Sequence, residues 1–284
     1  MTAEILNGKE LSDQLKEEMK QEVEALKQES IHPHLTVILV GDNPASKSYV
    51  KGKEKACEVT GISSSLIELP GSVSEQELLQ VIEKQNNDKE VHGILVQLPL
   101  PDHIDEQKVI HAISPLKDVD GFHPINIGKL VNGEETFLPC TPFGILTMLE
   151  SKNIEIEGRR AVIIGRSNIV GKPMGLLLLE RNATVTYCHS RTKNLREIAS
   201  EADILVVAMG REHAVDGSYV KEGAVVIDVG INRMDNGKLT GDVEFESAKE
   251  KAAYITPVPR GVGPMTITML LKNTIKAAKG LSEK

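Results

Sequence analysis

Short, β-branched apolar runs alternate with amphipathic segments along almost the whole chain, and this alternation constrains the fold more than any other feature. Residues 35–40, for example, form an apolar run that ends at Gly41, and residues 9–26 before it repeat apolar side chains at helical spacing. Such strand–helix–strand–helix order is typical of parallel sheets with helical crossovers. The predicted strands are 35–40, 62–69, 91–98, 160–164, 183–187, 204–208, 224–229 and 253–255. The predicted helices are 9–26, 45–59, 75–83, 106–113, 171–180 and 264–279.

A segment rich in Gly, Pro, Asp and Asn, residues 115–142, separates two such series. We interpret it as a loop region that bridges two structural units and carries part of an active site. Thr141 and Pro142 at its end are typical of a helix start, with Thr as N-cap and Pro at the first helical position. With 284 residues the chain is long enough for two domains, so we predict a two-domain α/β fold.

Composition excludes several classes of function. A net charge of −8 disfavours a nucleic-acid partner, and only 3% of the residues are aromatic, with no Trp, so single-stranded nucleic acid would find few rings to stack on. No apolar run approaches the length of a membrane span, and the start of the chain lacks the charge pattern of a signal peptide. Three widely spaced cysteines fit a reducing compartment, and we expect a cytoplasmic protein. We expect no metal, since His32 and His34 lack further ligands.

The strand at 160–164 leads into Gly165, Arg166 and Ser167, and then into a helix that begins near Gly171. Glycines at such a turn let the backbone approach a pyrophosphate at the helix N-terminus. Ser167 stands where the usual dinucleotide fingerprint has its second glycine, so the pattern alone also fits a purely structural turn.

The end of the next strand, 183–187, indicates which dinucleotide is bound. An NAD-specific site usually has an acidic residue there, but here the strand runs into Ser190 and Arg191 without one. A carboxylate would repel a 2′-phosphate, whereas Ser190, Arg191 and Arg166 can donate hydrogen bonds to it. We therefore predict NADP as the cofactor.

Four polar residues of the first half are candidates for catalysis, each with a structural alternative. Tyr49 and Lys53 share a helix face, but that helix carries four lysines, and spacing cannot choose among them. Gln97 lies near the end of a strand, where ligands bind in α/β sheets, although it could also cap a turn. Asp120 precedes Gly121, and on pattern alone a turn residue is the simpler interpretation.

Together with the nucleotide loop, these residues stand in motifs that resemble one enzyme family along essentially the whole chain. The motifs, in order, are Tyr49-x-x-x-Lys53, the segment 91–101, Lys117-Asp118-Val119-Asp120-Gly121, Pro139-Cys140-Thr141-Pro142, the segment 165–173, Asp228-Val229-Gly230-Ile231-Asn232 and the segment 257–266. The chain resembles the bifunctional methylenetetrahydrofolate dehydrogenase/methenyltetrahydrofolate cyclohydrolases.

The resemblance implies two reactions in one shared cleft, and a homodimer. NADP⁺ would oxidise 5,10-methylenetetrahydrofolate to the methenyl cation, which water would convert to 10-formyltetrahydrofolate. Lys53 would handle protons, Gln97 would orient it, Asp120 would anchor the pterin and Tyr49 would offer its ring and hydroxyl to the folate. The backbone near Ile231 would meet the nicotinamide.

The same resemblance predicts the division of the chain into domains. Residues 1–139 would form a folate-side α/β domain and residues 140–263 a Rossmann-like NADP-binding domain. The C-terminal helix, within residues 264–284, would return to pack on the first domain.

Three rival functions are disfavoured or left open by the same residues. A dehydrogenase of a small hydroxy or keto acid would not need Lys53, Gln97 and Asp120 together. A family member without cyclohydrolase activity is disfavoured by the presence of Lys53, and a non-catalytic NADP sensor would tolerate loss of all these residues. The chain also departs from many relatives in having Arg260, not Gly, before Gly261. Arg260 either binds the anionic glutamate tail of folate or is a solvent-facing loop residue.

Overall fold

The computed structural model describes residues 3–234 and 236–282, which form two compact units. Of the segments considered above, Met1 and Thr2 at the start and residues 283–284 at the end lie outside this description. One unit comprises the residues up to Ser12 together with Thr141–Thr266, and the other comprises Asp13–Cys140 together with the chain from Ile267 on.

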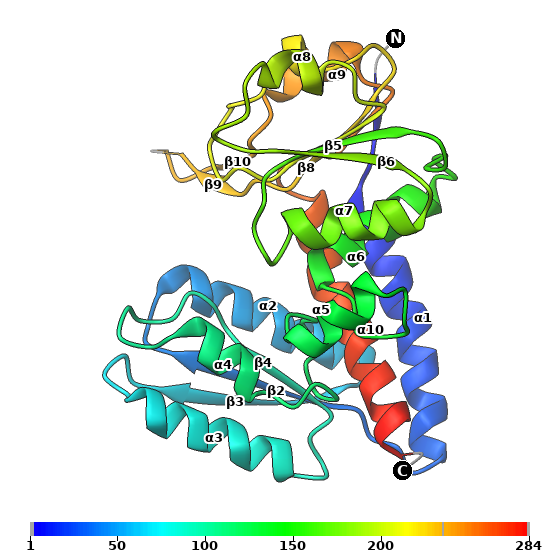
Figure 1. The fold of residues 1–284 in the computed structure, drawn as a ribbon. Helices are drawn as coiled ribbons and strands as arrows, with labels where there is room; N and C mark the ends of the chain where they lie inside the picture. Colours follow the sequence, from blue (N-terminus) through cyan, green and yellow to red (C-terminus); the bar gives the residue numbers. More distant parts are fainter. Residues whose placement is uncertain (1–2, 235, 283–284) are drawn as a thin grey trace. The chain divides into compact units, whose positions relative to one another are not determined.

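The second unit is built on a three-stranded parallel sheet of order β3-β2-β4. Its strands are β2 (His34–Val40), β3 (Ser63–Leu69) and β4 (Gly93–Val96). Helix α2 (Pro44–Thr60) covers one face, and α3 (Glu75–Asn87) with α4 (Glu106–Ala112) the other, as Figure 1 shows. Side chains alternate along a strand, so Ile38 and Val40 point toward Leu78 and Ile82 of α3 in one buried cluster.

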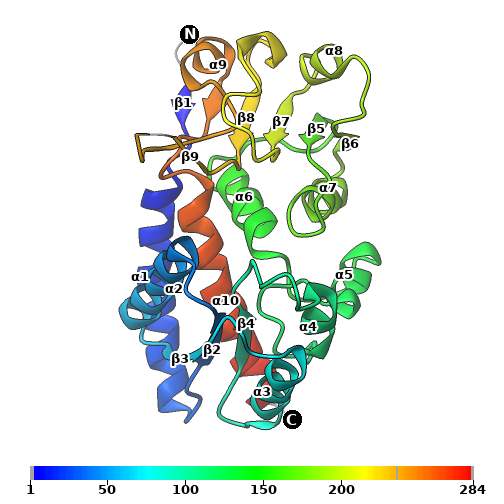
Figure 2. The same cartoon turned by 90° about the vertical axis from the view of Figure 1, so that its left-hand side faces the viewer.

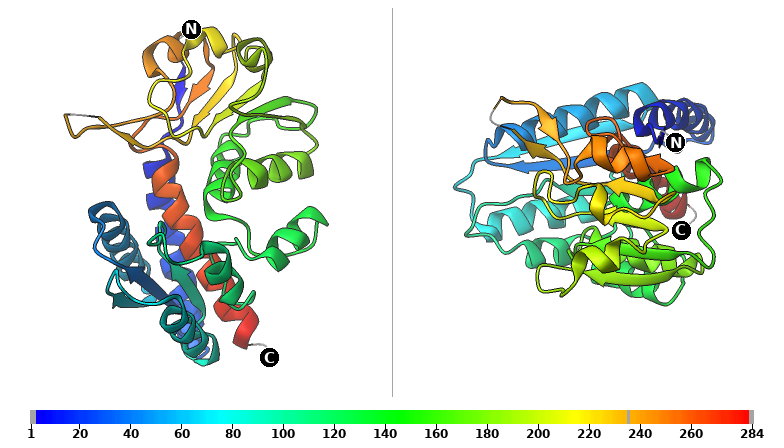
Figure 3. Two further views of the ribbon diagram at one scale, coloured as in Figure 1. Left: turned by 60° about the vertical axis from the view of Figure 1, so that its left-hand side comes forward. Right: turned by 90° about the horizontal axis from the view of Figure 1, so that it is seen from above.

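Helices close the remainder of this unit. The chain passes through α5 (Pro124–Val131), and α10 (Val262–Ser282) returns from the C-terminal end to lie beside α1 (Gly8–Gln28), as Figure 3 shows. Lys279 of α10 pairs with Glu22 of α1 at 2.6 Å. The predicted return of the C-terminal helix to the N-terminal half is thereby confirmed.

The first unit contains a six-stranded parallel sheet of order β1-β11-β8-β7-β5-β6. The order can be followed across the top of Figure 2. The strands are β1 (Glu4–Ile5), β5 (Arg160–Ile164), β6 (Thr184–Cys188), β7 (Ile204–Val207), β8 (Val225–Asp228) and β11 (Tyr254–Ile255). Both the fold class and the prediction of parallel strands are confirmed.

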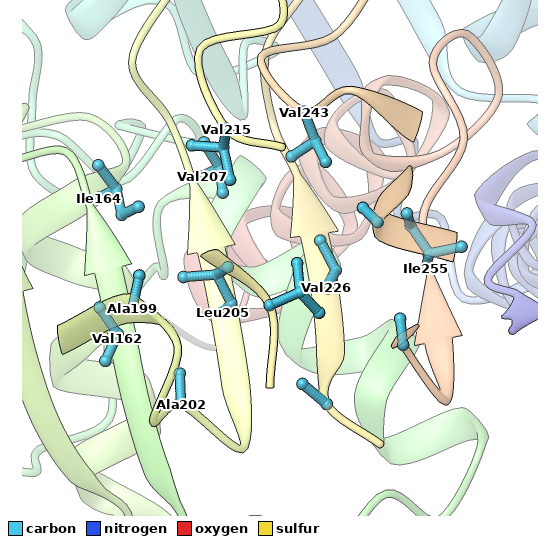
Figure 4. Close-up of a cluster of buried hydrophobic side chains, with 14 of the residues drawn as sticks. Val162, Ile164, Ala199, Ala202, Leu205, Val207, Val215, Val226, Val243 and Ile255 are labelled. Atoms are coloured by element: carbon cyan, nitrogen blue, oxygen red, sulfur yellow. The ribbon is translucent and has the colours of Figure 1, made fainter. Parts of the chain in front are cut away.

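Aliphatic side chains fill both faces of this sheet, as the scarcity of aromatic residues requires. On one face Val162, Leu205 and Val226 pack against Ala199 of α8 (Leu195–Ala199) and Ala248 of α9 (Phe245–Lys251), a cluster drawn in Figure 4. Helices α6 (Cys140–Ser151) and α7 (Gly171–Glu180) cover the opposite face (Figure 1). A hairpin of β9 (Asn232–Arg233) and β10 (Leu239–Thr240) and a short 3-10 helix, η1 (Gly217–Tyr219), complete the unit.

The structure differs from the sequence predictions at several places, and α8, α9 and the β9–β10 hairpin were not predicted. Strand β1 was not predicted, and its pairing with β11 places the first residues with the nucleotide-loop half, whereas we expected them in the N-terminal half. Helix α5 begins inside the predicted loop region 115–142, at Pro124. Thr141 is not an N-cap, because α6 starts one residue earlier and the Thr141 hydroxyl instead bonds that of Thr266 at 2.9 Å.

Candidate active site

Lys53 and Gln97 lie together in the second unit. Lys53 is on α2, and its Nζ donates a 2.7 Å hydrogen bond to Oε1 of Gln97, which directly follows β4. The amide of Gln97 is itself fixed, because its Nε2 donates to the carbonyl of Leu98 at 2.6 Å. Gln97 therefore presents only its oxygen to the lysine, and this arrangement holds the ammonium or amine group in one place.

Burial distinguishes Lys53 from the other lysines of α2. The side chains of Lys47, Lys51 and Lys55 are exposed, whereas Lys53 is partly buried. Burial lowers the pKa of Lys53, although the charge of Asp120 and the thiol groups of Cys140 and Cys57 act in the opposite direction. A lysine in this environment exchanges its proton more readily near neutral pH than one in water.

Asp120 lies close enough to influence this lysine. Burial raises the pKa of the Asp120 carboxyl to about 6; the charge of Lys53 opposes that rise, Asp118 adds to it, and a hydrogen bond with the Cys140 thiol opposes it. Asp120 also lines a small, mostly apolar hollow of about 20 Å³ beyond β4, together with Asp118, Leu98 and Phe122 among others. A carboxyl group in this position can accept hydrogen bonds from a ligand that approaches from outside the hollow.

The neighbouring Asp118 has a structural role. Its carboxylate accepts hydrogen bonds from the backbone N–H groups of Phe122 and His123 and from the amide of Asn126, at 3.2, 2.8 and 2.7 Å. These bonds hold the turn that leads into α5. Both acids of the Lys117–Gly121 motif line the hollow, and Asp118 is in addition engaged with the turn.

Tyr49 precedes Lys53 by one helical turn, and 44% of its surface is exposed. Its ring is thus accessible to a ligand that approaches this face of α2. The structure brings Lys53, Gln97 and Asp120 together through a hydrogen bond and the interaction of charges. It places Tyr49 on the same helix face as Lys53, one turn earlier.

In the first unit, three glycines shape the turn between β5 and α7. A Cβ on Gly165, whose φ is +143°, would lie 2.4 Å from the carbonyl oxygen of Ala208, at the end of β7. A Cβ on Gly171 would lie 2.4 Å from the Gly165 oxygen, and one on Gly175 would lie 2.1 Å from the Tyr187 hydroxyl. Close approach of strand end, turn and helix at these points is what a dinucleotide cradle needs, so the residues present fit NADP.

Ser167 has a structural role in this turn. Its Oγ accepts hydrogen bonds from the backbone N–H groups of Val170 and Gly171, at 3.2 and 3.3 Å, where α7 begins. Arg166 beside it is exposed. Ser167, which stands where the usual fingerprint has its second glycine, therefore stabilises the start of α7 with its hydroxyl.

Ser190 and Arg191 follow β6 on a tight turn. His189 accepts a bond from the backbone N–H of Arg191 at its Nδ1, at 3.2 Å, and donates its own backbone N–H to the Thr192 hydroxyl at 2.9 Å. The side chains of Ser190 and Arg191 are exposed at the end of the strand, where the ribose of a dinucleotide would lie. The turn presents donors without a carboxylate among residues 188–192.

Ile231 lies after β8 with 45% of its surface exposed. It lines a hollow of about 210 Å³ together with Gly230, Leu239 and the segment 257–264. Arg260 belongs to that segment; it is exposed and has a left-handed backbone, with φ of +83°.

Sequence reasoning missed two buried acids of this unit, Asp228 and Asp242. They are 4% and 0% exposed and accept several backbone hydrogen bonds. The only signal was an acid next to glycine in Asp228-Val229-Gly230 and Gly241-Asp242, which is also the pattern of ordinary turns.

The part of the chain from 3 to 282, residue 235 aside, contains no group of three or more His, Cys, Asp or Glu side chains placed to hold a metal ion. Within the same residues no helix is both long and apolar enough to cross a membrane.

Comparison with known proteins finds similarity along the whole chain. Residues 6–120 match the family model of the tetrahydrofolate dehydrogenase/cyclohydrolase catalytic domain, and residues 139–282 match that of the NAD(P)-binding domain. The bifunctional protein FolD of Oceanobacillus iheyensis is 76% identical over 281 residues, which cover 99% of each chain.

Solved structures give the same result. The dehydrogenase/cyclohydrolase of Campylobacter jejuni is 53% identical, with a TM-score of 0.97 over 98% of this chain and 99% of that one. The Trypanosoma brucei enzyme, solved with NADP and an inhibitor, is 37% identical, with a TM-score of 0.96 over the full length of both chains.

Proposed function

The chain belongs to the tetrahydrofolate dehydrogenase/cyclohydrolase family, and on that premise we propose which of its residues carry the two reactions. The enzyme oxidises 5,10-methylenetetrahydrofolate to 5,10-methenyltetrahydrofolate with NADP⁺, and it hydrolyses the product to 10-formyltetrahydrofolate. NADP⁺, when bound, accepts the hydride of the first reaction. The rest of the chemistry falls to groups of the protein.

Lys53 is the proton carrier of the hydrolysis. In its neutral form it accepts a proton from the water that adds to the amidinium carbon of the methenyl group. It then returns that proton to N5 as the bond between this carbon and N5 breaks, while the new hydroxyl releases its proton and becomes the formyl oxygen. The 2.7 Å bond between Lys53 and Gln97 is the observation that carries this assignment, and the lowered pKa of Lys53 supports it.

The other folate-side residues position the substrate. Asp120 accepts hydrogen bonds from the amino-pyrimidinone edge of the pterin, and its closeness to Lys53 supports this role. Tyr49 lays its exposed ring against the folate. Gln97 holds Lys53 without adding a charge, so the lysine can lose its proton.

The nucleotide side acts through geometry. The turn at Gly165, Arg166 and Ser167 holds the pyrophosphate, and Arg166, Ser190 and Arg191 donate to the 2′-phosphate. The backbone at Ile231 meets the nicotinamide end. Support for this comes from the glycine contacts of the turn and from the exposed donors after β6. Hydride transfer requires alignment of donor and acceptor more than acid–base catalysis.

We also propose that the protein is a cytoplasmic homodimer. Residues 1–139 and 264–284 would form the folate-side domain and residues 140–263 the NADP-binding domain, except that the residues up to Ser12 belong with the latter. Three free, buried cysteines are typical of proteins from a reducing compartment. Light scattering of the purified enzyme measures the subunit number directly.

Replacing Lys53 tests the assignment. We expect wild type to form NADPH from methylenetetrahydrofolate with little build-up of the methenyl compound. Lys53→Ala should hydrate preformed methenyltetrahydrofolate at least about 100-fold more slowly, the usual contribution of a positioned proton carrier. The absorbances of NADPH and of the methenyl compound, followed together, provide the measurement.

Lys55→Ala is the matched control, because Lys55 lies on the same helix and is exposed. It should hydrate at the wild-type rate. Wild type that forms no folate-dependent NADPH would refute the function, and Lys53→Ala that hydrates normally would refute the role of the lysine.

A further inference from the structure

Two buried carboxylates, Asp228 and Asp242, lie next to each other, one at the end of a strand of the six-stranded sheet and one just after the β9–β10 hairpin. Asp228 is the last residue of β8, and Asp242 follows β10. The oxygens of Asp228 accept hydrogen bonds from the backbone N–H groups of Gly230, Asp242 and Val243, at 2.9, 3.0 and 2.9 Å. Asp228 therefore fixes the segment that carries Asp242.

The carboxylate of Asp242 accepts hydrogen bonds from two other segments. Oδ2 accepts from the backbone N–H groups of Met209 and Gly210 at 2.6 and 2.9 Å, and Oδ1 accepts from that of Arg211 at 2.8 Å. Oδ1 also accepts from the side-chain amide of Asn232 at 2.8 Å. One fully buried side chain thus joins the loop after β7 to the residue that follows Ile231.

The backbone leaves no room beside these acids. A Cβ on Gly230 would lie 2.3 Å from Cγ of Asp242, and one on Gly241 would lie 1.7 Å from Oδ2 of Asp228. The two glycines are therefore required for the carboxylates to reach the N–H groups, and the loops and acids form one packed unit.

The joined segments lie at the part of the sheet where a ligand is expected. Strand β5 has β6 on one side and β7 on the other, so the direction of winding reverses between β5 and β7. Ligands of open parallel sheets bind beyond the carboxyl ends of the strands at such a reversal. The loop held by Asp242 follows β7, and Ile231, beside Asn232, lines the hollow described above.

We propose that Asp242 is a positioning residue that holds the nicotinamide half of the cofactor site in place without touching the cofactor. The inference rests on the proposed function for Ile231. All four described bonds of the Asp242 carboxylate go to the protein itself, and its side chain is 0% exposed, so its effect must pass through the two segments it joins.

Asp242→Asn tests the proposal, because it keeps the shape and turns one acceptor into a donor that faces N–H groups. We expect its affinity for NADP⁺, measured by calorimetry, to fall at least about tenfold, the effect of losing more than one charge-assisted bond. Adenosine 2′,5′-bisphosphate, which carries only the adenosine half, should bind within twofold of wild type. Hydration of preformed methenyltetrahydrofolate without NADP⁺ should also stay within twofold.

Two further variants complete the test. Asn232→Ala removes one of the four bonds and should weaken NADP⁺ about three- to tenfold, again without affecting the bisphosphate, even if Asp242→Asn folds poorly. Asp203→Asn is the matched control: Asp203 accepts a backbone N–H bond from Arg160 at the opposite end of β7, and its variant should bind NADP⁺ normally.

Equal weakening of NADP⁺ and of the bisphosphate, or an equal loss of hydration, would mean that Asp242 supports the whole fold, and the proposal would be wrong. Unchanged NADP⁺ binding in both variants would also overturn it. These binding results decide the matter even if wild type reduced no NADP⁺ with folate, an outcome that would refute the proposed function alone.

Discussion

The surroundings of Asp120 favour its neutral form, and this lowers the stability of the folded enzyme at neutral pH. The folded pKa of about 6 lies above the ordinary value of 3.8, so the folded state binds a proton more tightly than the unfolded state. The contribution of this group to stability is fully present below about pH 4 and is lost as the pH rises through 6. At neutral pH, the Asp120 carboxyl is ionised in surroundings that stabilise its protonated form better.

We therefore predict that Asp120→Asn stabilises the protein while it impairs folate turnover. From the two pKa values, the gain in free energy of unfolding at pH 7 is at most about 3 kcal/mol, and it disappears toward pH 4. Urea unfolding at pH 7 and at pH 4.5 provides the measurement.

Asp102→Asn, at an exposed position of the same unit, should give no comparable gain. A loss of stability in Asp120→Asn at pH 7 would show that burial of the charge is not costly.

Arg260 is the other residue whose local conformation is unfavourable. Its φ of +83° is one that side chains with a Cβ seldom adopt, at a cost of roughly 1 kcal/mol. Its backbone carbonyl accepts a hydrogen bond from the N–H of Lys9 at 3.0 Å, at the start of α1, so the strained turn also serves the helix. The position is consistent with either role we considered for the side chain.

At the scale of elements, the sequence predicts best where a local pattern is sufficient. The bounds of β5 and α7 agree with prediction to the residue, because a β-branched run and a glycine start mark them. β1 has two residues and acquires its identity only by pairing with β11. α5 has only eight residues and lies in a segment of loop-like composition, so it was not predicted.

The proposed functional residues also differ in whether a local pattern is sufficient to predict them. Glycines of the nucleotide turn can be read from their spacing after a strand. Lys53 cannot be chosen from four lysines by spacing, because its difference is burial, which contacts distant in sequence create. Asp242 is less accessible still to sequence reasoning, since the N–H groups that it binds lie about thirty residues earlier in the chain.

The nucleotide turn yields a prediction for the element β5–α7. Gly171→Ala should weaken NADP⁺ binding at least about tenfold, since its Cβ would lie 2.4 Å from a backbone oxygen and only a shift of the turn could relieve the clash. Hydration of methenyltetrahydrofolate, which we assign to residues of the other unit, should remain. Calorimetric titration and the hydration assay test the two halves of this prediction.

Gly128→Ala is a suitable control, since nothing lies within 4 Å of a Cβ at that helical position. It should leave NADP⁺ binding unchanged. Normal NADP⁺ affinity in Gly171→Ala would mean that the turn tolerates the displacement and that its close approach is not needed.

At the scale of the whole molecule, the chain passes back and forth between the two units. Residues up to Ser12 contribute to the unit that contains the nucleotide turn, although 128 residues of the other unit, Asp13–Cys140, follow before the chain returns. Leu6, which is 2% exposed, bonds through its N–H to the carbonyl of Ile255 at 2.8 Å. The beginning of the chain is thus part of the six-stranded sheet.

Leu6→Ala tests this placement. A cavity left by a buried leucine costs about 2–5 kcal/mol, and the loss should be felt first in the sheet that Leu6 joins. Amide hydrogen exchange should accelerate in β11 and β8, whereas β2 should exchange as in wild type.

Ile5→Ala, at a position that is 36% exposed, should change exchange much less. Faster exchange in β2 than in β11 for Leu6→Ala would place the start of the chain with the other unit.

The interleaved path of the chain also bears on how such an enzyme can be rearranged by recombination. Neither unit is one continuous stretch of the gene, because the chain enters one unit, leaves it for the other, returns and leaves again. A single crossover therefore cannot exchange the nucleotide-binding unit for that of another dehydrogenase. Any such swap needs three joints made together, which favours inheritance of both activities as one block.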